Sequence, residues 1–275
     1  MTAILTWNIQ CGRGCDGRVD LARIARVAQA MGESDVLCFQ EVARNDPGIA
    51  GGADQLAELQ ALFPQHQAFF GAALDRTGTG MQRRQFGNLL LSRLPVLQMY
   101  FHLLPHPAEG GIKHMQRQAI EAVVETRAGP LRVVTTHLEY YSAAHRAVQI
   151  ERLRSLQAEV AENEARPSKP AASPYDPVPR PASLVLCGDL NFLPHEDAYG
   201  VLFAPPLLDA WRSARGDEGH PPSTGLYDRN QWPMGGHCRD YFAVTADVAQ
   251  RVAEIAIDTA TDASDHQPLR LTLHD

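Results

Sequence analysis

Hydrophobic residues in this chain gather into short runs that recur from one end to the other. Nine runs have the length of strands and are rich in Val, Ile, Leu, Thr and Phe: residues 4–9, 35–42, 86–92, 119–125, 131–138, 183–190, 240–245, 252–257 and 268–273. This length and composition predict β-strands. Several runs are apolar at nearly every position, which is typical of strands that are covered on both faces.

Between these runs, apolar residues recur at helical spacing in three places. The three stripes are Leu21, Ile24, Ala28 and Met31; then Leu56, Leu59, Leu62 and Phe63; then Ala147, Ile150, Leu153, Leu156 and Val160. Spacings of three and four residues predict amphipathic helices that each bury one face. Helices placed among many strands predict β-sheets packed face to face with helices outside them.

One segment shows neither the strand pattern nor the helical pattern. Residues 166–181 hold six prolines together with Ser, Ala and Lys, which predicts an irregular loop. Runs of similar character lie on both sides of it, so we expect a Pro-rich surface insertion rather than a domain boundary. The chain is therefore predicted to form a single domain over residues 1–275.

Composition narrows the possible partners and the compartment. The formal net charge is -7, which makes an extended clamp on duplex DNA less expected, although a local basic rim remains compatible with it. We find no secretory leader and no apolar stretch of membrane-spanning length, so we predict no stable membrane association. The five cysteines suggest no disulfide framework, and Cys11 and Cys15 lack a matching pair at zinc-like spacing. A cytoplasmic location is expected.

Polar side chains stand where the predicted strands begin or end. They are Asn8, Glu41, His137, Asp189 with Asn191, Asp240, and Asp265 with His266. Each one alone has an ordinary role available to it, such as a turn, a cap or a salt bridge. Their shared position at strand ends instead predicts that they meet at one rim of a sheet. Carboxylates, carboxamides and a histidine in that position could hold a hard divalent cation against a phosphate and activate water.

Seven short segments carry a resemblance to a known family: Trp7-Asn8, Gln40-Glu41, Gly87-Asn88 with Leu91-Ser92-Arg93, Thr136-His137-Leu138, Gly188-Asp189-Leu190-Asn191, Asp240-Tyr241-Phe242 and Ser264-Asp265-His266. In this order the chain resembles the endonuclease/exonuclease/phosphatase superfamily, which includes DNase I and the exonuclease III-type abasic-site nucleases. The resemblance implies a four-layer α/β/β/α sandwich, with two mixed β-sheets face to face and helices outside. It also implies a Mg²⁺- or Mn²⁺-dependent phosphoesterase.

The resemblance assigns roles around the metal and the attacking water. It implies that Glu41 is the main metal ligand, with Asn8 and Asp265 helping through direct or water-bridged contacts. It implies that Asp189 and Asn191 orient or activate the attacking water and hold a phosphate oxygen.

Further roles follow from the same resemblance. His266, oriented by Asp240, would bind the phosphate or act as the base, so the base is either Asp189 or His266. His137 would stabilise developing charge or assist the leaving group. Arg117 and Asn88 would contact the substrate.

The chain departs from the abasic-site nucleases at one position. The residue two past the first Asn is an acidic metal ligand in those enzymes, and here it is the neutral Gln10. This difference favours hydrolysis with one metal ion.

The first hypothesis for function is hydrolysis of a phosphodiester of the nucleic-acid type. The alternatives are a lipid or inositol-phosphate phosphatase or phosphodiesterase and a non-catalytic binding module. Residues 99–104 are apolar and could touch lipid, although a core strand fits them better. The sequence does not predict endo or exo action, or the oligomeric state.

Overall fold

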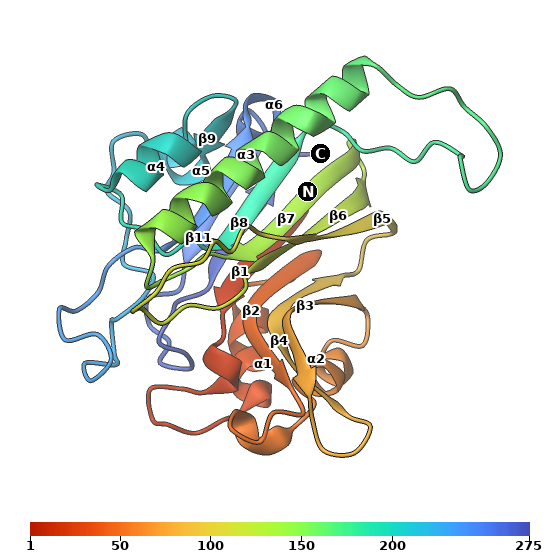
Figure 1. Cartoon of the computed structure of the whole chain (residues 1–275). Helices are drawn as coiled ribbons and strands as arrows, with labels where there is room; N and C mark the ends of the chain where they lie inside the picture. Colours follow the sequence, from red (N-terminus) through yellow and green to blue (C-terminus); the bar gives the residue numbers. More distant parts are fainter.

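The computed structural model describes residues 1–275 and contains two six-stranded β-sheets (Figure 1). The first sheet has the order β11-β12-β1-β2-β4-β3, with strands β1 (Thr2–Asn8), β2 (Val36–Arg44), β3 (Gln67–Thr77), β4 (Arg83–Ser92), β11 (Val252–Ile257) and β12 (Leu269–Leu273). The second has the order β5-β6-β7-β8-β10-β9, with strands β5 (Val96–Leu103), β6 (Gln118–Thr126), β7 (Gly129–His137), β8 (Leu184–Asp189), β9 (Leu207–Asp209) and β10 (Asp240–Thr245). Both sheets mix parallel and antiparallel pairs.

The helices are α1 (Leu21–Ala30), α2 (Gln55–Leu62), α3 (Ala143–Ala165), α4 (Asp197–Leu202), α5 (Ala210–Arg215) and α6 (Ala246–Ala249), with short 3₁₀ turns η1 (Gln10–Gly12) and η2 (Ala50–Gly52). Helices α1 and α2 cover the outer face of the first sheet, α3 and α4 cover that of the second, and α5 and α6 pack against the core between the sheets. In Figure 1, α1 and α2 lie against the first sheet, and α3 runs across the second. The predicted α/β/β/α sandwich is confirmed. None of the helices combines the length and the apolar character that crossing a membrane requires.

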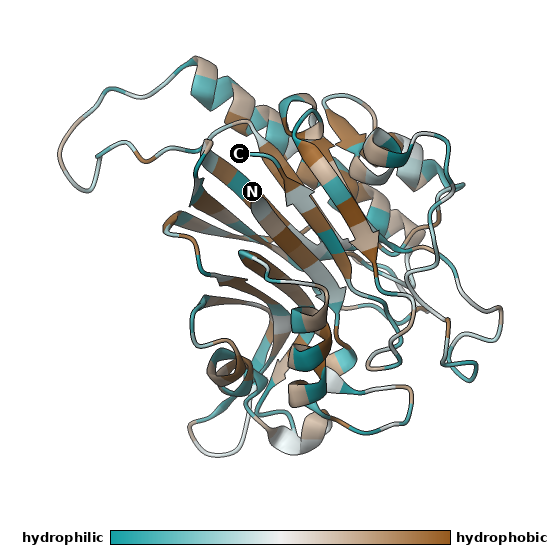
Figure 2. Cartoon of the chain, turned by 180° about the vertical axis from the view of Figure 1, so that it is seen from behind, coloured by the Kyte–Doolittle hydropathy of each residue, from teal (hydrophilic) through white to brown (hydrophobic).

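Alternation along the strands separates the cores between these layers. In β1, Ile4 faces the core between the two sheets, whereas Leu5 and Trp7 pack with the residues of α1 and α2. In β8, Cys187 faces the central core and Leu186 packs toward Ile150 and Leu153 of α3. Successive side chains of a strand point to opposite faces, so strands apolar at every position fill two cores at once. Figure 2 shows these strands as bands of brown with hydrophilic loops around them.

All nine predicted strands and all three predicted helices are present, and each lies within a few residues of its expected bounds. Two long strands, β3 and β5, were not predicted, and both lie at sheet edges. The apolar segment 99–104 largely coincides with β5, but it is not simply a core strand. Phe101 is 55% exposed and Leu103 is 67% exposed on this edge.

The Pro-rich segment 166–181 connects α3 to β8 and projects from the body of the molecule as an irregular arm (Figure 1). Chain from before and after this arm is paired in both sheets, because β1 pairs with β12 and β7 pairs with β8. We therefore infer that residues 1–275 form one domain with a surface insertion.

Candidate active site

Pairing between strands places the predicted polar residues at one end of both sheets. β1 and β2 run parallel, as do β7 and β8, so the carboxyl ends of each pair lie together. Asp240 begins β10 directly opposite Asp189. Asp265 and His266 come just before β12, which is antiparallel to β1 and therefore starts where β1 ends. The indole of Trp7 donates a hydrogen bond to the His266 carbonyl at 2.8 Å, which fastens these two segments together.

Glu41 lies in an irregular part of β2. The register with β4 shifts between Phe39 and Val42, and Glu41 has a φ of 58°. A bulge of this kind turns a side chain away from the direction that a regular strand would give it. A left-handed backbone at a residue other than glycine costs energy, and such strain often occurs at functional sites.

Gly188 allows β8 to lie close to β7. Its φ is 140°, and a Cβ atom at this position would lie 1.9 Å from the Thr136 carbonyl oxygen. Only glycine fits such an approach without moving the backbone. Asp189 follows at once and pairs in register with His137, so the glycine helps to set the position of both side chains.

Asn8 connects two carboxylates at the centre of the site. Its side-chain amide donates hydrogen bonds to Glu41 Oε1 and to Asp189 Oδ2, both at 3.0 Å. The His137 ring lies beside the same pair, with Nε2 3.4 Å from Asp189 Oδ2 and Nδ1 3.9 Å from Glu41 Oε1. Four side chains that were predicted to be separate ligands or catalysts thus form one contact group.

His266 lies between two aspartates. Its Nδ1 is 2.8 Å from Asp240 Oδ2, and its Nε2 is 3.6 Å from Asp189 Oδ2. The Ser223 hydroxyl donates to the same Asp240 oxygen at 2.7 Å and so helps to orient this carboxylate. The predicted pairing of His266 with Asp240 is present in the structure.

Asp265 is held by residues that the sequence did not single out. The Trp232 indole and the Gln231 amide both donate to Asp265 Oδ2, at 2.9 Å and 2.8 Å. The Gln10 side chain reaches this site through Gln231, whose side-chain oxygen accepts its amide at 2.9 Å, and the Gln10 backbone N–H donates to Asn8 Oδ1 at 3.1 Å. The neutral Gln10 therefore supports a neighbour of Asp265.

The carboxylates and imidazoles of the site shift one another's pKa values. Burial would lower the pKa of His266, but the charges of Asp240, Asp189 and Asp265 raise it well above its ordinary value. Burial would raise the pKa of Asp189, yet His266 and His137 hold it below its usual range. His266 is thus protonated and Asp189 ionised at neutral pH.

His137 has the opposite character. Burial, together with the nearby Arg117 charge, lowers its pKa to about 3, so its imidazole is neutral at physiological pH. Burial also raises the pKa of Glu41, and the negative charges of Asp265 and Asp189 add to this effect. The site therefore concentrates negative charge around Glu41, which a bound cation would relieve.

These side chains open into a cavity of about 480 Å³, whose lining residues are Glu41, Arg117, His137, Tyr140, Tyr141, Asp189, Asn191, Gln231, Trp232, Asp265 and His266. Three aromatic residues form part of its wall. The Tyr140 and Trp232 rings meet edge to face with centroids 5.8 Å apart, and the Arg239 guanidinium lies 5.1 Å from the Tyr140 ring centre. Tyr140 and Tyr141 are 38% and 51% exposed, so their rings are accessible from solvent.

The remaining predicted residues fall into two groups. Arg117 lines the cavity and donates to Glu139 Oε2 at 3.2 Å, while the Asn191 amide donates to the Leu138 carbonyl at 2.9 Å. Asn88 does not line the cavity. It is 3% exposed, and its amide donates to the Gln118 carbonyl at 3.2 Å between the two sheets.

The donor set fits a hard divalent cation. The Glu41 and Asp265 carboxylates line the same cavity, and the Glu41 carboxylate is bonded to Asn8 beside Asp189. Asp189, Asp240 and His266 also place one ligand atom each within 4.8 Å of one another, but the protonated His266 is bonded to Asp240 and has no lone pair for a cation. Asp240 Oδ1 and His137 Nδ1 are buried and have no hydrogen-bond partner in the protein, which is uncommon away from binding sites. Carboxylate and amide oxygens are the ligands that Mg²⁺ and Mn²⁺ accept.

A family model described as "Endonuclease/Exonuclease/phosphatase family" matches residues 5–266, a span that contains every residue of this pocket. The chain belongs to this family. No match was found among curated protein sequences. Members of the endonuclease/exonuclease/phosphatase family are phosphoesterases, and membership supports a hydrolase of phosphoric esters here.

Solved structures of the same family share the fold. An endonuclease/exonuclease/phosphatase from Beutenbergia cavernae is 24% identical with a TM-score of 0.69, over 98% of this chain and 70% of that one. D. rerio TDP2 complexed with a single-strand DNA product is 19% identical, with a TM-score of 0.65 over 100% and 99% of the two chains. The 3′ phosphatase NExo from Neisseria, bound to a product DNA hairpin, is 17% identical, with a TM-score of 0.64 over 100% of both chains.

Proposed function

We propose that this protein is a Mg²⁺- or Mn²⁺-dependent phosphoesterase that hydrolyses a phosphodiester of the nucleic-acid type by in-line attack of water. The observation that carries this proposal is the meeting of side chains from six strands or strand ends at one cavity: Asn8, Glu41, His137, Asp189, Asp240, Asp265 and His266. Family membership supports the reaction class.

Glu41 is the proposed main ligand of the cation, and Asn8 and Asp265 assist it. Bound there, the cation would withdraw negative charge from the phosphate and from the leaving oxygen. The surrounding residues keep these ligands oriented, since Gln231 and Trp232 both bond Asp265.

Asp189 is the proposed acceptor for the proton of the attacking water. It is 2% exposed and ionised, and the Asn8 amide and its own backbone turn orient its two oxygens. A fixed carboxylate can align a water molecule and take its proton as the new P–O bond forms and the opposite P–O bond breaks. The assignment favours Asp189 over His266 as the base because His266 is already protonated.

His266 instead acts as a charged donor to a phosphate oxygen. Its Nδ1–H is bonded to Asp240, which leaves Nε2–H to point to a second acceptor. Charged donors fixed in a buried site stabilise the negative charge that develops in the transition state. Asp240 is thus a positioning residue.

His137, Asn191 and Arg117 complete the phosphate site in this proposal. The neutral His137 can donate one hydrogen bond to the phosphate or to the leaving oxygen. Arg117 and Asn191 line the same cavity, and Arg117 is fixed by Glu139. Asn88 remains a predicted substrate contact, although it is 3% exposed and its amide is bonded to the Gln118 carbonyl.

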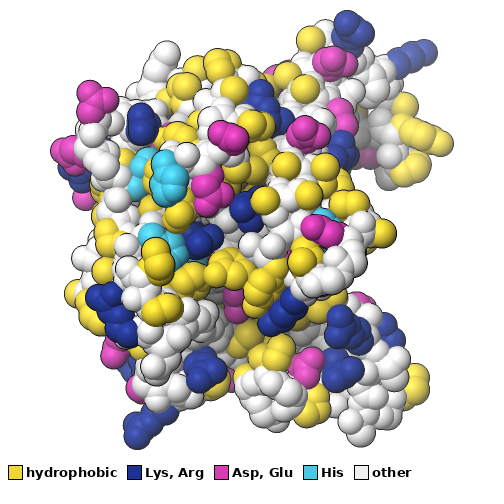
Figure 3. All heavy atoms as spheres, turned by 60° about the vertical axis from the view of Figure 1, so that its left-hand side comes forward, with side chains coloured by type: hydrophobic (Ala, Val, Ile, Leu, Met, Phe, Trp, Pro, Cys, Tyr) yellow, Lys and Arg dark blue, Asp and Glu magenta, His cyan; other side chains and the backbone are white.

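The aromatic wall favours nucleic acid as the substrate. Bases stack on Tyr and Trp rings regardless of sequence, and Arg beside such rings adds cation–π attraction. Figure 3 shows acidic and basic side chains interspersed on one face of the molecule without a broad basic field. Together with the net charge of -7, this supports contact with a short or single-stranded segment of nucleic acid.

All five cysteines are unpaired, in keeping with the proposed cytoplasmic location.

The test is a substrate panel with Mg²⁺ or Mn²⁺ and purified protein. Single-stranded and hairpin oligonucleotides should be cleaved or dephosphorylated, while sphingomyelin and inositol phosphates should turn over far more slowly. The Asp189→Asn variant is the matched inactive control. Cleavage of lipid or inositol substrates alone would favour the alternative substrate class, and no cation-stimulated turnover on any substrate would indicate a binding module.

Tyr140→Leu tests the aromatic wall by itself. Loss of one stacked base costs about 1–3 kcal/mol, so we expect KM for an oligonucleotide to rise roughly 5- to 150-fold with little change in kcat. A small chromogenic phosphodiester that carries no nucleobase should have the same KM in the wild-type protein and in Tyr140→Leu. An equal rise in KM for both substrates would rule out base stacking on this ring.

A further inference from the structure

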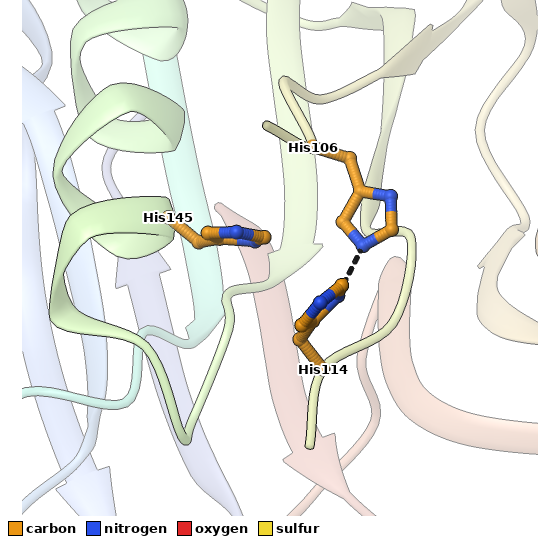
Figure 4. Close-up of side chains that lie close together, drawn as sticks. All are labelled: His106, His114 and His145. Atoms are coloured by element: carbon orange, nitrogen blue, oxygen red, sulfur yellow. Dashed lines mark hydrogen bonds between the residues drawn. The ribbon is translucent and has the colours of Figure 1, made fainter. Parts of the chain in front are cut away.

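Three histidines meet outside the catalytic cavity. His106 and His114 lie on the segment between β5 and β6, and His145 lies in the first turn of α3 (Figure 4). One ring nitrogen from each lies within 4.8 Å of those of the other two, and the ring centroids are 4.8–5.2 Å apart. In Figure 4 the three rings approach one another from the two elements.

His145 has unused bonding capacity in the interior. It is 0% exposed, and neither of its ring nitrogens has a hydrogen-bond partner in the protein. Buried polar groups are nearly always paired, so a buried imidazole that makes no hydrogen bond, with only the Glu109 carboxylate 3.3 Å from its Nε2, needs a physical cause. A ligand shared by the three rings would satisfy it.

Nearby groups hold the cluster in a form suited to metal binding. His114 Nε2 is 3.0 Å from the Glu109 carbonyl, which leaves Nδ1 as the lone-pair nitrogen that faces His106 Nε2 at 2.7 Å. Histidines that bind metals typically donate their other N–H to a backbone carbonyl in this way. Glu109 adds a carboxylate, with Oε2 3.3 Å from His145 Nε2. Ser142, which caps α3, donates to that same oxygen.

We propose that these residues form a structural zinc site, distinct from the catalytic cation site, with the ligands His106, His114, His145 and Glu109. Three imidazoles and one carboxylate complete a four-coordinate zinc shell, and such closed shells are typical of structural zinc. Zinc at 2.0–2.1 Å from each nitrogen would separate the nitrogens by about 3.3 Å in a tetrahedron. The His106 and His114 nitrogens would therefore move slightly apart from 2.7 Å, and the other pairs, which lie within 4.8 Å, would adjust to the same separation.

The ion would fasten the segment between β5 and β6 to the start of α3. The same region supports the catalytic cavity, because Glu139 accepts hydrogen bonds from Arg117 and from the backbone of Met115 and Tyr141. Arg117 and Tyr141 both line that cavity. Zinc thus stabilises the fold and holds one wall of the cavity in place, without taking part in the reaction.

The test measures zinc binding directly on the full chain. Protein stripped with a chelator is titrated with Zn²⁺ in excess Mg²⁺, and bound zinc per chain is measured by elemental analysis. Co²⁺ in place of zinc should give the visible absorption of a tetrahedral ion. We expect one tightly bound zinc in the wild-type protein and a higher melting temperature when it is present.

Three single substitutions test whether zinc binds at these histidines. His106→Ala and His114→Ala should weaken zinc binding on the order of 100-fold or more, since even changes to groups behind a ligand cost 10–100-fold. Both residues are at least partly exposed, so these variants should keep the far-UV circular dichroism of the wild type. His195→Ala, at an exposed histidine outside the cluster, is the matched control and should bind zinc normally.

The Asp189→Asn variant distinguishes zinc bound at the histidine cluster from zinc bound in the catalytic cavity. It should retain the tight zinc and the cobalt spectrum. If Asp189→Asn abolishes the tight zinc, or if the two cluster variants keep it, the proposal is wrong. It is equally wrong if the wild-type protein binds no zinc, in which case the cluster is a hydrogen-bonded group only.

Discussion

At the scale of single residues, the site depends on opposite protonation of neighbouring groups. His266 is charged because three carboxylates surround it, whereas His137, at the end of β7 in the other sheet, is neutral because it is buried beside Arg117. Asp189 contacts both rings. Two histidines that both contact Asp189 thus differ in charge because of their other contacts, which the sequence alone did not reveal.

Asp189→Asn keeps the size of the side chain and removes its charge and its basicity. We expect kcat to fall about 10²- to 10⁴-fold, as for loss of a general base, while the melting temperature stays close to that of the wild type. In His266→Ala, kcat should fall by a similar factor because a charged hydrogen-bond donor is lost. Retention of near-normal kcat in either variant would contradict the assignment of that residue.

Glu41→Ala tests the proposed cation ligand. Removing the main carboxylate should raise the Mg²⁺ concentration that gives half-maximal activity by about 10-fold or more. Saturating Mg²⁺ should restore part of the rate, because Asn8 and Asp265 remain. The measurement is a Mg²⁺ titration of activity, with Gln10→Ala as the comparison, since the Gln10 side chain reaches the site through Gln231. An unchanged titration curve for Glu41→Ala would place the ligand elsewhere.

At the scale of elements, the central strands were all predictable, whereas of the four edge strands only β11 was predicted. β1, β8 and β10 are buried at every position, so each is a continuous apolar run that ends at a polar residue. β3 and β5 have one partner each and are mostly half-exposed, which dilutes the apolar pattern. Burial on both faces made most strands recognisable in the sequence, and β11, which is only partly buried, is the exception.

Under α3, a buried ion-pair network joins β6, β7 and the end of the arm. Glu121 is 0% exposed and accepts hydrogen bonds from Arg132 at 2.9 Å and from Arg180 at 2.7 and 2.8 Å. Arg132 also donates to Gln157 of α3 at 2.7 Å. Burial would raise the pKa of Glu121, but Arg180, His102 and Arg132 hold it well below its ordinary value of 4.5.

Glu121→Gln should therefore destabilise the fold strongly at neutral pH. Two arginines would lose the charge that compensates them, at a cost of about 3–5 kcal/mol in the free energy of unfolding. Because the folded pKa is depressed, this contribution is present above pH 4.5 and is lost as the pH falls below it. Urea unfolding should show the difference from wild type shrinking in that range.

Glu125→Gln on the same strand, at an exposed position, is the control and should change stability by less than about 0.5 kcal/mol. A Glu121→Gln protein as stable as this control at pH 7 would mean that the network contributes nothing.

At the scale of the whole molecule, the sequence predicted which residues meet but not what surrounds them. The strand-end residues were found because parallel pairs carry their carboxyl ends to one rim. Tyr140, Tyr141 and Trp232 come from loops, where no periodic pattern places a side chain. His106, His114 and His145 were missed because a loop and a helix bring them together from distant positions.

The arm at 166–181 leaves the molecule at the opposite end of the sheets from the catalytic cavity, because β7 and β8 both run toward that cavity and α3 returns between them. Severing the backbone there would divide the catalytic residues between two polypeptides, with Asn8, Glu41 and His137 on one and Asp189, Asp240, Asp265 and His266 on the other. Each polypeptide would also lack partner strands in both sheets. Turnover would then appear only when the two halves reassociate, which makes this chain a natural candidate for a split-enzyme reporter.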